Sequence, residues 1–272
     1  MVKLWVRDVS VLPFMSKSAR VINNLLISTA GVKIVNANEF AVSGVWINRL
    51  IHFAKLLEMV KDVEGDVVEC GVGWGKSLAI LGLLVKHSDM SRNLWGFDSF
   101  EGLPHPTDED SPESSRYAKQ RMFGEATERA VVTNLSAVGL DDEFLQSRVS
   151  LVKGWFSETL PSYGGSTIAL LHIDADLYES YKTTLENLWP KVAIGGIVAF
   201  DEYHLRMWPG AKKAVDEFFA DRPGSIEMLK STVSSHRYVV RLRRVSLSGI
   251  NSSGREEQAL DVAHTAVHGR HH

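Results

Sequence analysis

Four acidic side chains follow two strand-like segments in pairs, a spacing that can bind a cation. Asp174 and Asp176 come at the end of one apolar run, and Asp201 and Glu202 come at the end of the next. In a parallel sheet both ends face the ligand crevice, where four carboxylates repel one another unless a cation neutralises them. Oxygen ligands with no cysteine nearby favour Mg²⁺ or a similar hard ion. Helix capping is the alternative, above all for Asp176, which precedes a helical segment.

A glycine-rich segment, ECGVGWGKS at 69–77, follows the first apolar strand and opens a helix. Glycines let the backbone turn tightly and approach a ligand, and a helix N-terminus favours electronegative groups. A dinucleotide fingerprint would need glycine where Lys76 stands, and a phosphate-binding P-loop would need glycine where Cys70 stands, so the P-loop is a near miss that stays open. The cofactor loop of class I methyltransferases, an acidic residue followed by G-x-G-x-G, fits without exception at Glu69, Gly71, Gly73 and Gly75.

Asp98 ends the second strand-like run, beside this loop. A carboxylate in that position can accept hydrogen bonds from both hydroxyls of a ribose, and a P-loop enzyme has no use for one there. We therefore predict a nucleoside-type cofactor, with Asp98 and the adjacent Ser99 in its site. Trp155 and Phe156 follow the third strand, where enzymes of this class place neighbours of the adenine ring, although both could equally be core residues.

These motifs lie in an alternation of short β-branched runs and helical stretches. We expect strands at 66–71, 93–100, 148–154, 167–176, 192–202, 225–231 and 237–244. Helices are expected at 45–63, 76–87, 128–139, 178–189 and 209–222. This order implies an α/β fold with a doubly wound, mostly parallel sheet of seven strands, Rossmann-like, and an antiparallel hairpin at the C-terminal edge. The polar stretch 101–125 is long for a connection, and such loops are often lids or binding loops.

Length and composition are those of an ordinary globular protein, with 272 residues, 44% of them apolar and 23% charged. We expect a helical extension at 1–60, a cofactor-binding domain at 61–244 and a mobile polar tail at 245–272. The net charge of −3 gives no reason to expect nucleic acid or membrane as a partner. No apolar run reaches the roughly 18 residues that span a bilayer, so we expect a cytoplasmic protein. An exposed amphipathic helix at 45–63 would favour a homo-oligomer.

Several of these motifs together carry a resemblance to a known family. The glycine loop, DSFEGLP at 98–104, HIDADLYES at 172–180 and the acidic pair before Tyr203 are similar to the macrocin O-methyltransferase (TylF/MycF/NovP-like) family. The resemblance covers roughly residues 60–222 and implies methylation of sugar hydroxyls in antibiotic biosynthesis, with S-adenosylmethionine (SAM) and Mg²⁺. It implies that Asp174, Asp201 and Glu202 bind the metal, that Asp176 is the general base and that Asp98 binds the ribose. The family usually carries Asp-Asp where this chain has Asp201-Glu202.

The predicted function is therefore SAM-dependent O-methylation of a hydroxyl on a sugar or another natural-product intermediate, assisted by a divalent cation. Chelation by the cation favours acceptors with two adjacent oxygens, such as a vicinal diol or a catechol. Two alternatives stay open: a P-loop nucleotide-binding protein, and a non-catalytic subunit that binds SAM or S-adenosylhomocysteine (SAH). His172 is interpreted as a packed core residue, and His204 as a candidate for substrate contact.

Overall fold

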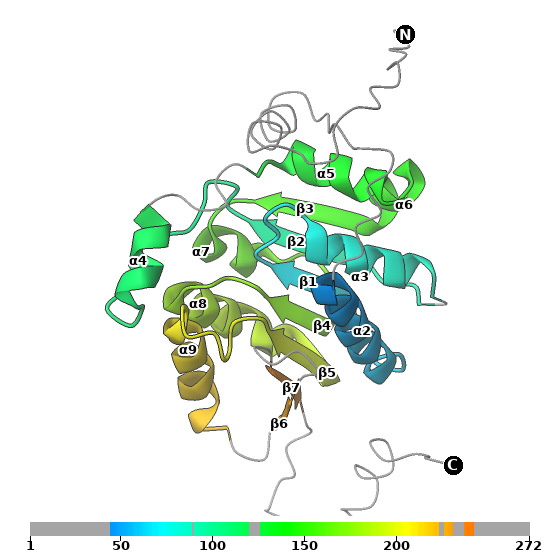
Figure 1. The fold of residues 1–272 in the computed structure, drawn as a ribbon. Helices are drawn as coiled ribbons and strands as arrows, with labels where there is room; N and C mark the ends of the chain where they lie inside the picture. Colours follow the sequence, from blue (N-terminus) through cyan, green and yellow to red (C-terminus); the bar gives the residue numbers. More distant parts are fainter. Residues whose placement is uncertain (1–43, 89, 120–125, 223–225, 231–236, 242–272) are drawn as a thin grey trace, which may run out of the picture.

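The computed structural model describes most of the chain from the forty-fourth residue onward (Figure 1). The described residues are 44–88, 90–119, 126–222, 226–230 and 237–241. The expected tail at 245–272, and residues 1–43 of the expected N-terminal extension, lie outside them.

Within the described residues, seven strands form one sheet in the order β3-β2-β1-β4-β5-β7-β6. The strands are β1 (Asp66–Cys70), β2 (Leu94–Asp98), β3 (Val149–Lys153), β4 (Ile168–Ile173), β5 (Val192–Phe200), β6 (Ile226–Lys230) and β7 (Arg237–Arg241). The first five are parallel, and β7 runs antiparallel between β5 and β6. The prediction of a doubly wound, mostly parallel sheet with an antiparallel C-terminal edge is confirmed.

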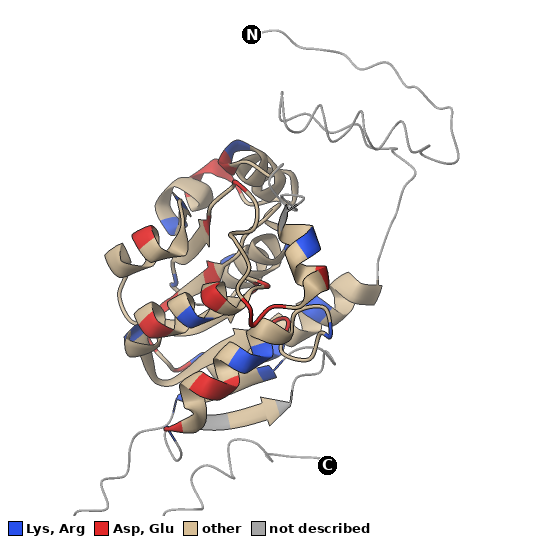
Figure 2. Ribbon diagram, turned by 90° about the vertical axis from the view of Figure 1, so that its left-hand side faces the viewer, with Lys and Arg blue, Asp and Glu red and all other residues tan. Residues whose placement is uncertain are grey.

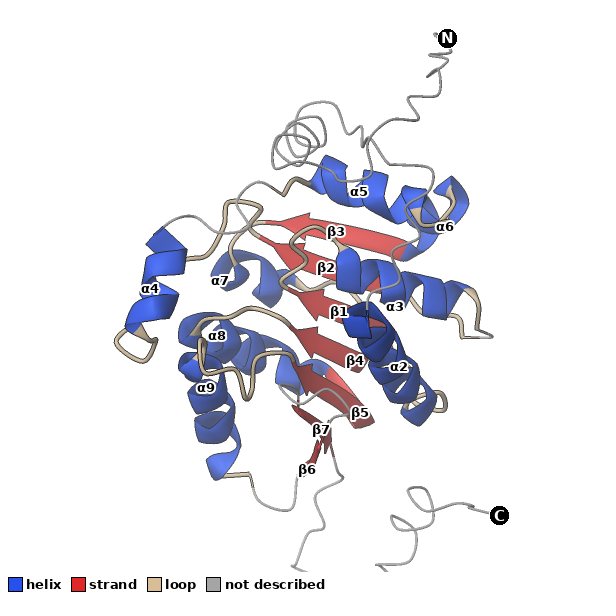
Figure 3. Ribbon diagram, viewed as in Figure 1, coloured by secondary structure: helices blue, strands red, loops and turns tan. Residues whose placement is uncertain are grey.

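Helices cover both faces of the sheet (Figure 3). One hydrophobic core lies between the sheet and α2 (Gly44–Met59), α3 (Lys76–Lys86) and α5 (Glu128–Ala137). The other lies between the sheet and α8 (Tyr178–Leu188) and α9 (Pro209–Ala220). Every residue of β1 and β4 is buried, as expected for central parallel strands covered on both sides. The two cores therefore fix the carboxyl ends of β1 and β4, from which the site is built.

The predicted helix at 45–63 is α2, and it is part of the core. Phe53, Leu56 and Leu57 are buried against the sheet, whereas Ile47 and Ile51 on its other side are exposed. Because the buried positions recur three and four residues apart, one face of the helix packs and the other faces solvent. None of the described helices is both long enough and apolar enough to cross a membrane.

Several short helices have no counterpart in the prediction. They are α4 (Pro112–Lys119), α6 (Asp142–Arg148), α7 (Phe156–Thr159) and the 3₁₀ turns Leu160–Ser162 and Trp189–Lys191. The stretch 101–125, which we expected to be a long loop, thus contains a helix. That helix has the sequence PESSRYAK, which lacks an apolar period, and its first turn is fastened to a distant segment: Ser111 and Ser114 both donate to the carbonyl of Met207.

Acidic and basic residues are interspersed along the helices that face the viewer in Figure 2. Several form ion pairs three or four positions apart on one helix, such as Lys212 with Asp216 and Lys182 with Glu179. Such exposed pairs contribute little to stability. They give the helices of that side a mixed-sign surface, in agreement with the small net charge.

Candidate active site

A cavity of about 480 Å³ opens at the carboxyl ends of the parallel strands. The loops after β1, β2, β3 and β4 and the first turns of α2 line it, and they bring residues from across the sequence together. In open parallel sheets this edge is where ligands bind. The volume lies in the range of ordinary cofactor and ligand sites.

The glycine loop after β1 forms one wall of the cavity. Gly71 has φ of 93°, and a Cβ atom built on it would lie 1.7 Å from the carbonyl oxygen of Asp174, so only glycine fits. Gly75, with φ of 77°, is the N-cap of α3. A Cβ on Gly73 would meet nothing within 4 Å, because this residue faces open space. The loop thus exposes backbone and a helix N-terminus to any ligand in the cavity.

Asp98, at the end of β2, is held by two backbone amides. Its Oδ2 accepts a hydrogen bond of 2.8 Å from the Gly73 amide, and its Oδ1 accepts one of 2.7 Å from the Phe100 amide. The hydroxyl of Ser99 donates to the Gly102 carbonyl and accepts from the Glu101 amide, so it holds its own turn. Both residues line the cavity. Each carboxylate oxygen of Asp98 keeps a second lone pair for a ligand hydroxyl.

Trp155 and Phe156 line the same cavity, after β3 and next to Asp98. The Gly154 amide donates to the Asp98 carbonyl at 3.0 Å, which fixes that loop against the end of β2. Phe156 also packs against the core on the α8 side. The two ring systems therefore border the cavity where a flat, apolar part of a ligand would meet them.

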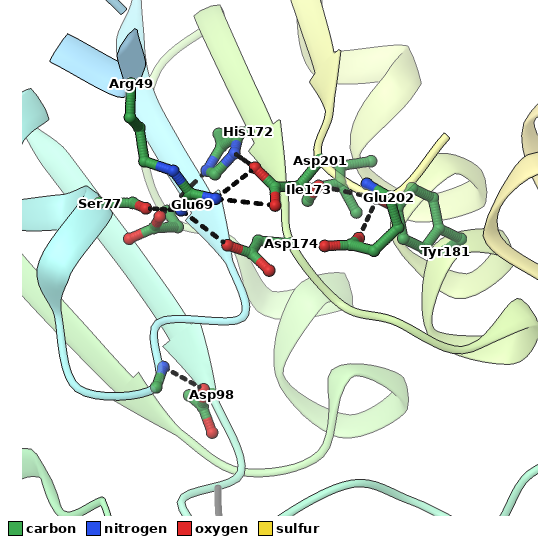
Figure 4. A network of polar contacts seen from close by, with 11 residues as sticks. Arg49, Glu69, Ser77, Asp98, His172, Ile173, Asp174, Tyr181, Asp201 and Glu202 are labelled. Atoms are coloured by element: carbon green, nitrogen blue, oxygen red, sulfur yellow. Dashed lines mark hydrogen bonds and ion pairs between the residues drawn. The ribbon is translucent and has the colours of Figure 1, made fainter. Parts of the chain in front are cut away.

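Three of the four predicted acids, Asp174, Asp201 and Glu202, gather at the ends of β4 and β5 with a guanidinium among them (Figure 4). Arg49 of α2 reaches both oxygens of Asp201, at 2.9 and 2.8 Å, and lies 3.3 Å from Oδ2 of Asp174. Burial works against the charged form of Arg49, but Asp201 and Asp174 outweigh it and raise the pKa. Sequence reasoning missed Arg49, since its acidic partners lie more than a hundred positions away and no local pattern marks it.

Asp176 lies at the cavity and has an uncommon backbone. Its φ is 60°, in the left-handed region that aspartate tolerates better than most residues, and the residue is 8% exposed. Burial and the charges of Asp174 and Asp201 raise its pKa well above the ordinary value. It does not cap α8, because the Tyr178 amide at the helix start donates to Asp110 Oδ1 at 3.0 Å. The side chain of Asp176 is thus left for the cavity.

Behind the cavity, a buried histidine links two acids. His172 Nδ1 lies 3.0 Å from Glu69 Oε1, and its Nε2 lies 3.5 Å from Asp201 Oδ1, which is long for a hydrogen bond. Burial disfavours the imidazolium, yet the two neighbouring carboxylates raise the pKa of His172 to about 9. His172 is buried, as the core interpretation expected, but it is also paired. Glu69, expected at the cofactor, is completely buried and lies behind the cavity wall rather than in it.

Glu202 lies on the far side of the cluster. Tyr181 of α8 donates to its Oε2 at 2.5 Å, and the Glu202 amide donates to the same phenol oxygen. Burial and the charges of Asp174 and Asp201 raise the pKa of Glu202 well above its usual range. The carboxyl therefore lies beside Asp174 and Asp201, but it is engaged by a tyrosine that sequence reasoning did not single out.

The donor set at this edge fits a divalent cation. Among the described residues, ligand atoms of His172, Asp174 and Asp201 lie within 4.8 Å of one another. His172 Nε2 is buried and has no hydrogen-bond partner. Carboxylate oxygens suit Mg²⁺ and Mn²⁺, and an imidazole nitrogen is compatible with Mn²⁺. Glu202 is outside this group of three, although its neighbour Asp201 belongs to it.

The remaining candidates divide between cavity and core. Trp74 and Lys76 line the cavity, together with Trp46 of α2, whose ring lies 5.2 Å from the Lys76 ammonium. Trp208 is buried in the core. His204 is exposed, packs edge-on against the Tyr203 ring and is not among the cavity residues.

The sheet order, the glycine loop after β1 and the acid at the end of β2 together define a class I methyltransferase fold. A comparison with protein families matches residues 32–231 to the macrocin-O-methyltransferase (TylF) family. The chain belongs to this family and is an O-methyltransferase of natural-product biosynthesis.

Individual relatives agree with this assignment. A demethyldecarbamoylnovobiocin O-methyltransferase of Streptomyces niveus is 37% identical over 189 residues, which are 68% of this chain and 69% of the relative. An 8-demethyl-8-(2,3-dimethoxy-alpha-L-rhamnosyl)-tetracenomycin-C 4'-O-methyltransferase of Streptomyces olivaceus is 36% identical over 52% of this chain and 54% of its own. The solved structure of the O-methyltransferase NovP is 33% identical, with a TM-score of 0.64 over 72% of this chain and 81% of that chain.

Proposed function

We propose that this enzyme transfers the methyl group of SAM to a hydroxyl of a sugar or another small natural-product intermediate, with help from a divalent cation. The observation that carries the proposal is the continuity of one cavity. The glycine loop and Asp98 line it together with Asp174 and Asp176, so a cofactor site and an acid cluster share one space.

The cofactor part of the proposal assigns a contact to each wall. The Gly71–Gly75 loop and the first turn of α3 would hold the amino-acid end of SAM, and Asp98 would accept hydrogen bonds from its ribose hydroxyls. Trp155 and Phe156 would border the adenine ring. Ser99 would act mainly by holding the turn after Asp98, because its hydroxyl is bonded to that turn already.

The acceptor part rests on the acid cluster. SAM supplies an electrophilic methyl group, and a divalent cation held by Asp174 and Asp201, with Glu202 next to them, would lower the pKa of an acceptor hydroxyl that it binds. Asp176 would take the hydroxyl proton as the oxygen attacks. Burial, the first cause of the raised pKa of Asp176, favours uptake of the proton by its carboxylate. Orientation of the acceptor in the cavity would supply much of the remaining acceleration.

The acceptor we infer carries two neighbouring oxygens. A cation bound beside Asp176 selects a vicinal diol over an isolated hydroxyl, because chelation fixes both oxygens and acidifies them. The name of the tetracenomycin relative places its methyl transfer at the 4' oxygen of a 2,3-dimethoxy-rhamnosyl group, where the neighbouring oxygen is that of a methoxy group. This relation supports sugars as the first acceptor class to test.

The two alternatives predict different binding. A P-loop protein would bind ATP with Mg²⁺ and ignore SAH, and the family assignment does not favour it. A non-catalytic subunit would bind SAH, but the change Asp176→Asn would then have no consequence for turnover, since there would be none.

The deciding experiment is calorimetric titration of the full-length protein with SAH, once with Mg²⁺ and once with EDTA, and with ATP as the matched control ligand. We expect SAH to bind in both buffers and ATP in neither. SAM turnover with vicinal-diol sugars, which EDTA should suppress, then tests the metal. Equal methylation with and without EDTA would refute metal assistance, and ATP binding without SAH binding would refute the cofactor assignment.

A further inference from the structure

The acid cluster already holds a cation that belongs to the chain itself. The Nη2 atom of Arg49 contacts both oxygens of Asp201, and Nη1 contacts Asp174 at 3.3 Å (Figure 4). Nη1 also donates to the Ser77 hydroxyl at 2.5 Å. The Arg49 side chain is 17% exposed and that of Asp201 is 8% exposed. Little water therefore screens this ion pair, and its geometry is fixed from both α2 and α3.

The two carboxylates that Arg49 contacts, those of Asp174 and Asp201, belong to the same donor set that fits a divalent cation. A second positive charge placed on those oxygens would repel the guanidinium. We propose that Arg49 is an internal counter-ion, which binds Asp174 and Asp201 in the metal-free enzyme and competes with the divalent cation for them. This inference rests on the proposed metal-assisted function.

The charges around Arg49 explain why a divalent cation can displace it. The carboxyl groups that gather here are Glu69, Asp174, Asp176, Asp201 and Glu202. Against them, the basic partners in the cluster are Arg49 and His172, each with at most one positive charge. A divalent ion neutralises more of this charge than a guanidinium does. Asp174 is the weaker of the two Arg49 contacts and lines the cavity, so Arg49 separates from it most easily.

Displacement of Arg49 would also affect a side chain that lines the cavity. Trp46, one helical turn earlier on α2, has its ring 5.7 Å from the Arg49 guanidinium and 5.2 Å from the Lys76 ammonium. Arg49 therefore connects the acid cluster to an aromatic side chain that lines the cavity. The coupling is reciprocal, since whatever tightens Arg49 on the acids weakens cation binding by the same factor.

The test measures cation affinity directly, with Mn²⁺ as the probe and no acceptor present. The full-length protein, Arg49→Met and Arg49→Lys are titrated with MnCl₂, and free Mn²⁺ is followed by electron paramagnetic resonance. Methionine removes the charge but keeps an unbranched side chain, and lysine keeps the charge. We expect Arg49→Met to bind Mn²⁺ on the order of tenfold more tightly than the unchanged protein, and Arg49→Lys to stay close to it. Ser77→Ala, which loosens Arg49 without changing any charge, should shift the affinity in the same direction by less.

The outcomes separate this inference from the function on which it rests. Equal or weaker Mn²⁺ binding by folded Arg49→Met would overturn the role of Arg49 while leaving the metal site intact. If Arg49→Met binds Mn²⁺ and the unchanged protein does not, the result would support the competition between Arg49 and the cation most strongly. Failure of every variant to bind Mn²⁺ would overturn both the metal site and the inference. Should Arg49→Met fail to fold by circular dichroism, Ser77→Ala decides, and an unchanged affinity would count against the counter-ion.

Discussion

The strongest single prediction concerns Asp98 and the affinity for SAH. Each carboxylate oxygen accepts one backbone amide, from Gly73 and from Phe100, and keeps one lone pair for a ribose hydroxyl. Loss of two hydrogen bonds to a charged acceptor, at about 1.5 kcal/mol each, removes about 3 kcal/mol of binding free energy. Asp98→Ala should therefore weaken SAH binding by on the order of a hundredfold.

Calorimetric titration of SAH into wild-type and Asp98→Ala protein measures this difference. Ser99→Ala is the matched control, because its hydroxyl is bonded to the Gly102 carbonyl and the Glu101 amide rather than directed at a ligand, and it should change the affinity much less. Circular dichroism and the thermal midpoint establish that both variants are folded. A folded Asp98→Ala protein with nearly wild-type SAH affinity would refute the assignment of the ribose to Asp98.

Three further predictions concern the base, the loop and the cysteine. Asp176→Asn should keep SAH affinity but slow single-turnover methyl transfer by about 10²–10⁴-fold, because asparagine tolerates the same backbone conformation without accepting the proton. An unchanged rate would exclude Asp176 as the base. In urea unfolding, Gly71→Ala should lower the free energy of unfolding clearly more than Gly73→Ala, since only the first places a Cβ against the Asp174 carbonyl. Equal losses would contradict the close packing of Gly71 against that carbonyl. Burial raises the pKa of the Cys70 thiol, so a thiol reagent should label it only as the protein unfolds. Urea-unfolded protein is the control. Rapid labelling of the native protein would show that the end of β1 is open to solvent.

Local periodicity predicted the main elements because each buries its own apolar face. The helices expected at 76–87 and 209–222 are observed at Lys76–Lys86 and Pro209–Ala220. The strand expected at 167–176 ends earlier, at Ile173. The Asp174 amide still donates to the Cys70 carbonyl at 2.9 Å, and the backbone leaves the extended conformation by Asp176, whose φ is 60°. The sequence leaves the end of such a strand ambiguous, because an acidic residue after an apolar run can be either the last residue of the strand or the first of the loop.

Short polar helices could not be predicted because distant partners stabilise them. Helix α4 has little apolar character, and its first turn is held by hydrogen bonds to Met207, more than ninety positions away. Helix α6 does have a local signal, since the Asp141 side chain accepts from the Phe144 amide as an N-cap. That cap stands in a run of acidic residues, where it does not differ from ordinary surface charge.

The site was predictable where its residues adjoin strand ends. The glycine loop, Asp98 and the paired acids follow β1, β2, β4 and β5, and strand order alone brings them to one edge. Arg49 and Tyr181 project from helices and meet the acids only through tertiary packing. The roles of the predicted residues in catalysis and cofactor binding stay predictions.

The segment after β2 borders the cavity, so we expect it to influence which acceptors the enzyme takes. Leu103, Pro104 and His105 line the cavity, and the residues that follow are fastened by Asp110 to the start of α8 and by Ser111 and Ser114 to Met207. In each of these hydrogen bonds the segment contributes a side chain and its partner contributes a backbone atom. A substitution at Tyr178 or Met207 therefore leaves these hydrogen bonds possible, because only their backbone atoms take part. A segment grafted from a relative, by contrast, must supply the side chains that anchor it. Because Leu103 also packs against the core, an exchange of the lining residues must preserve that contact.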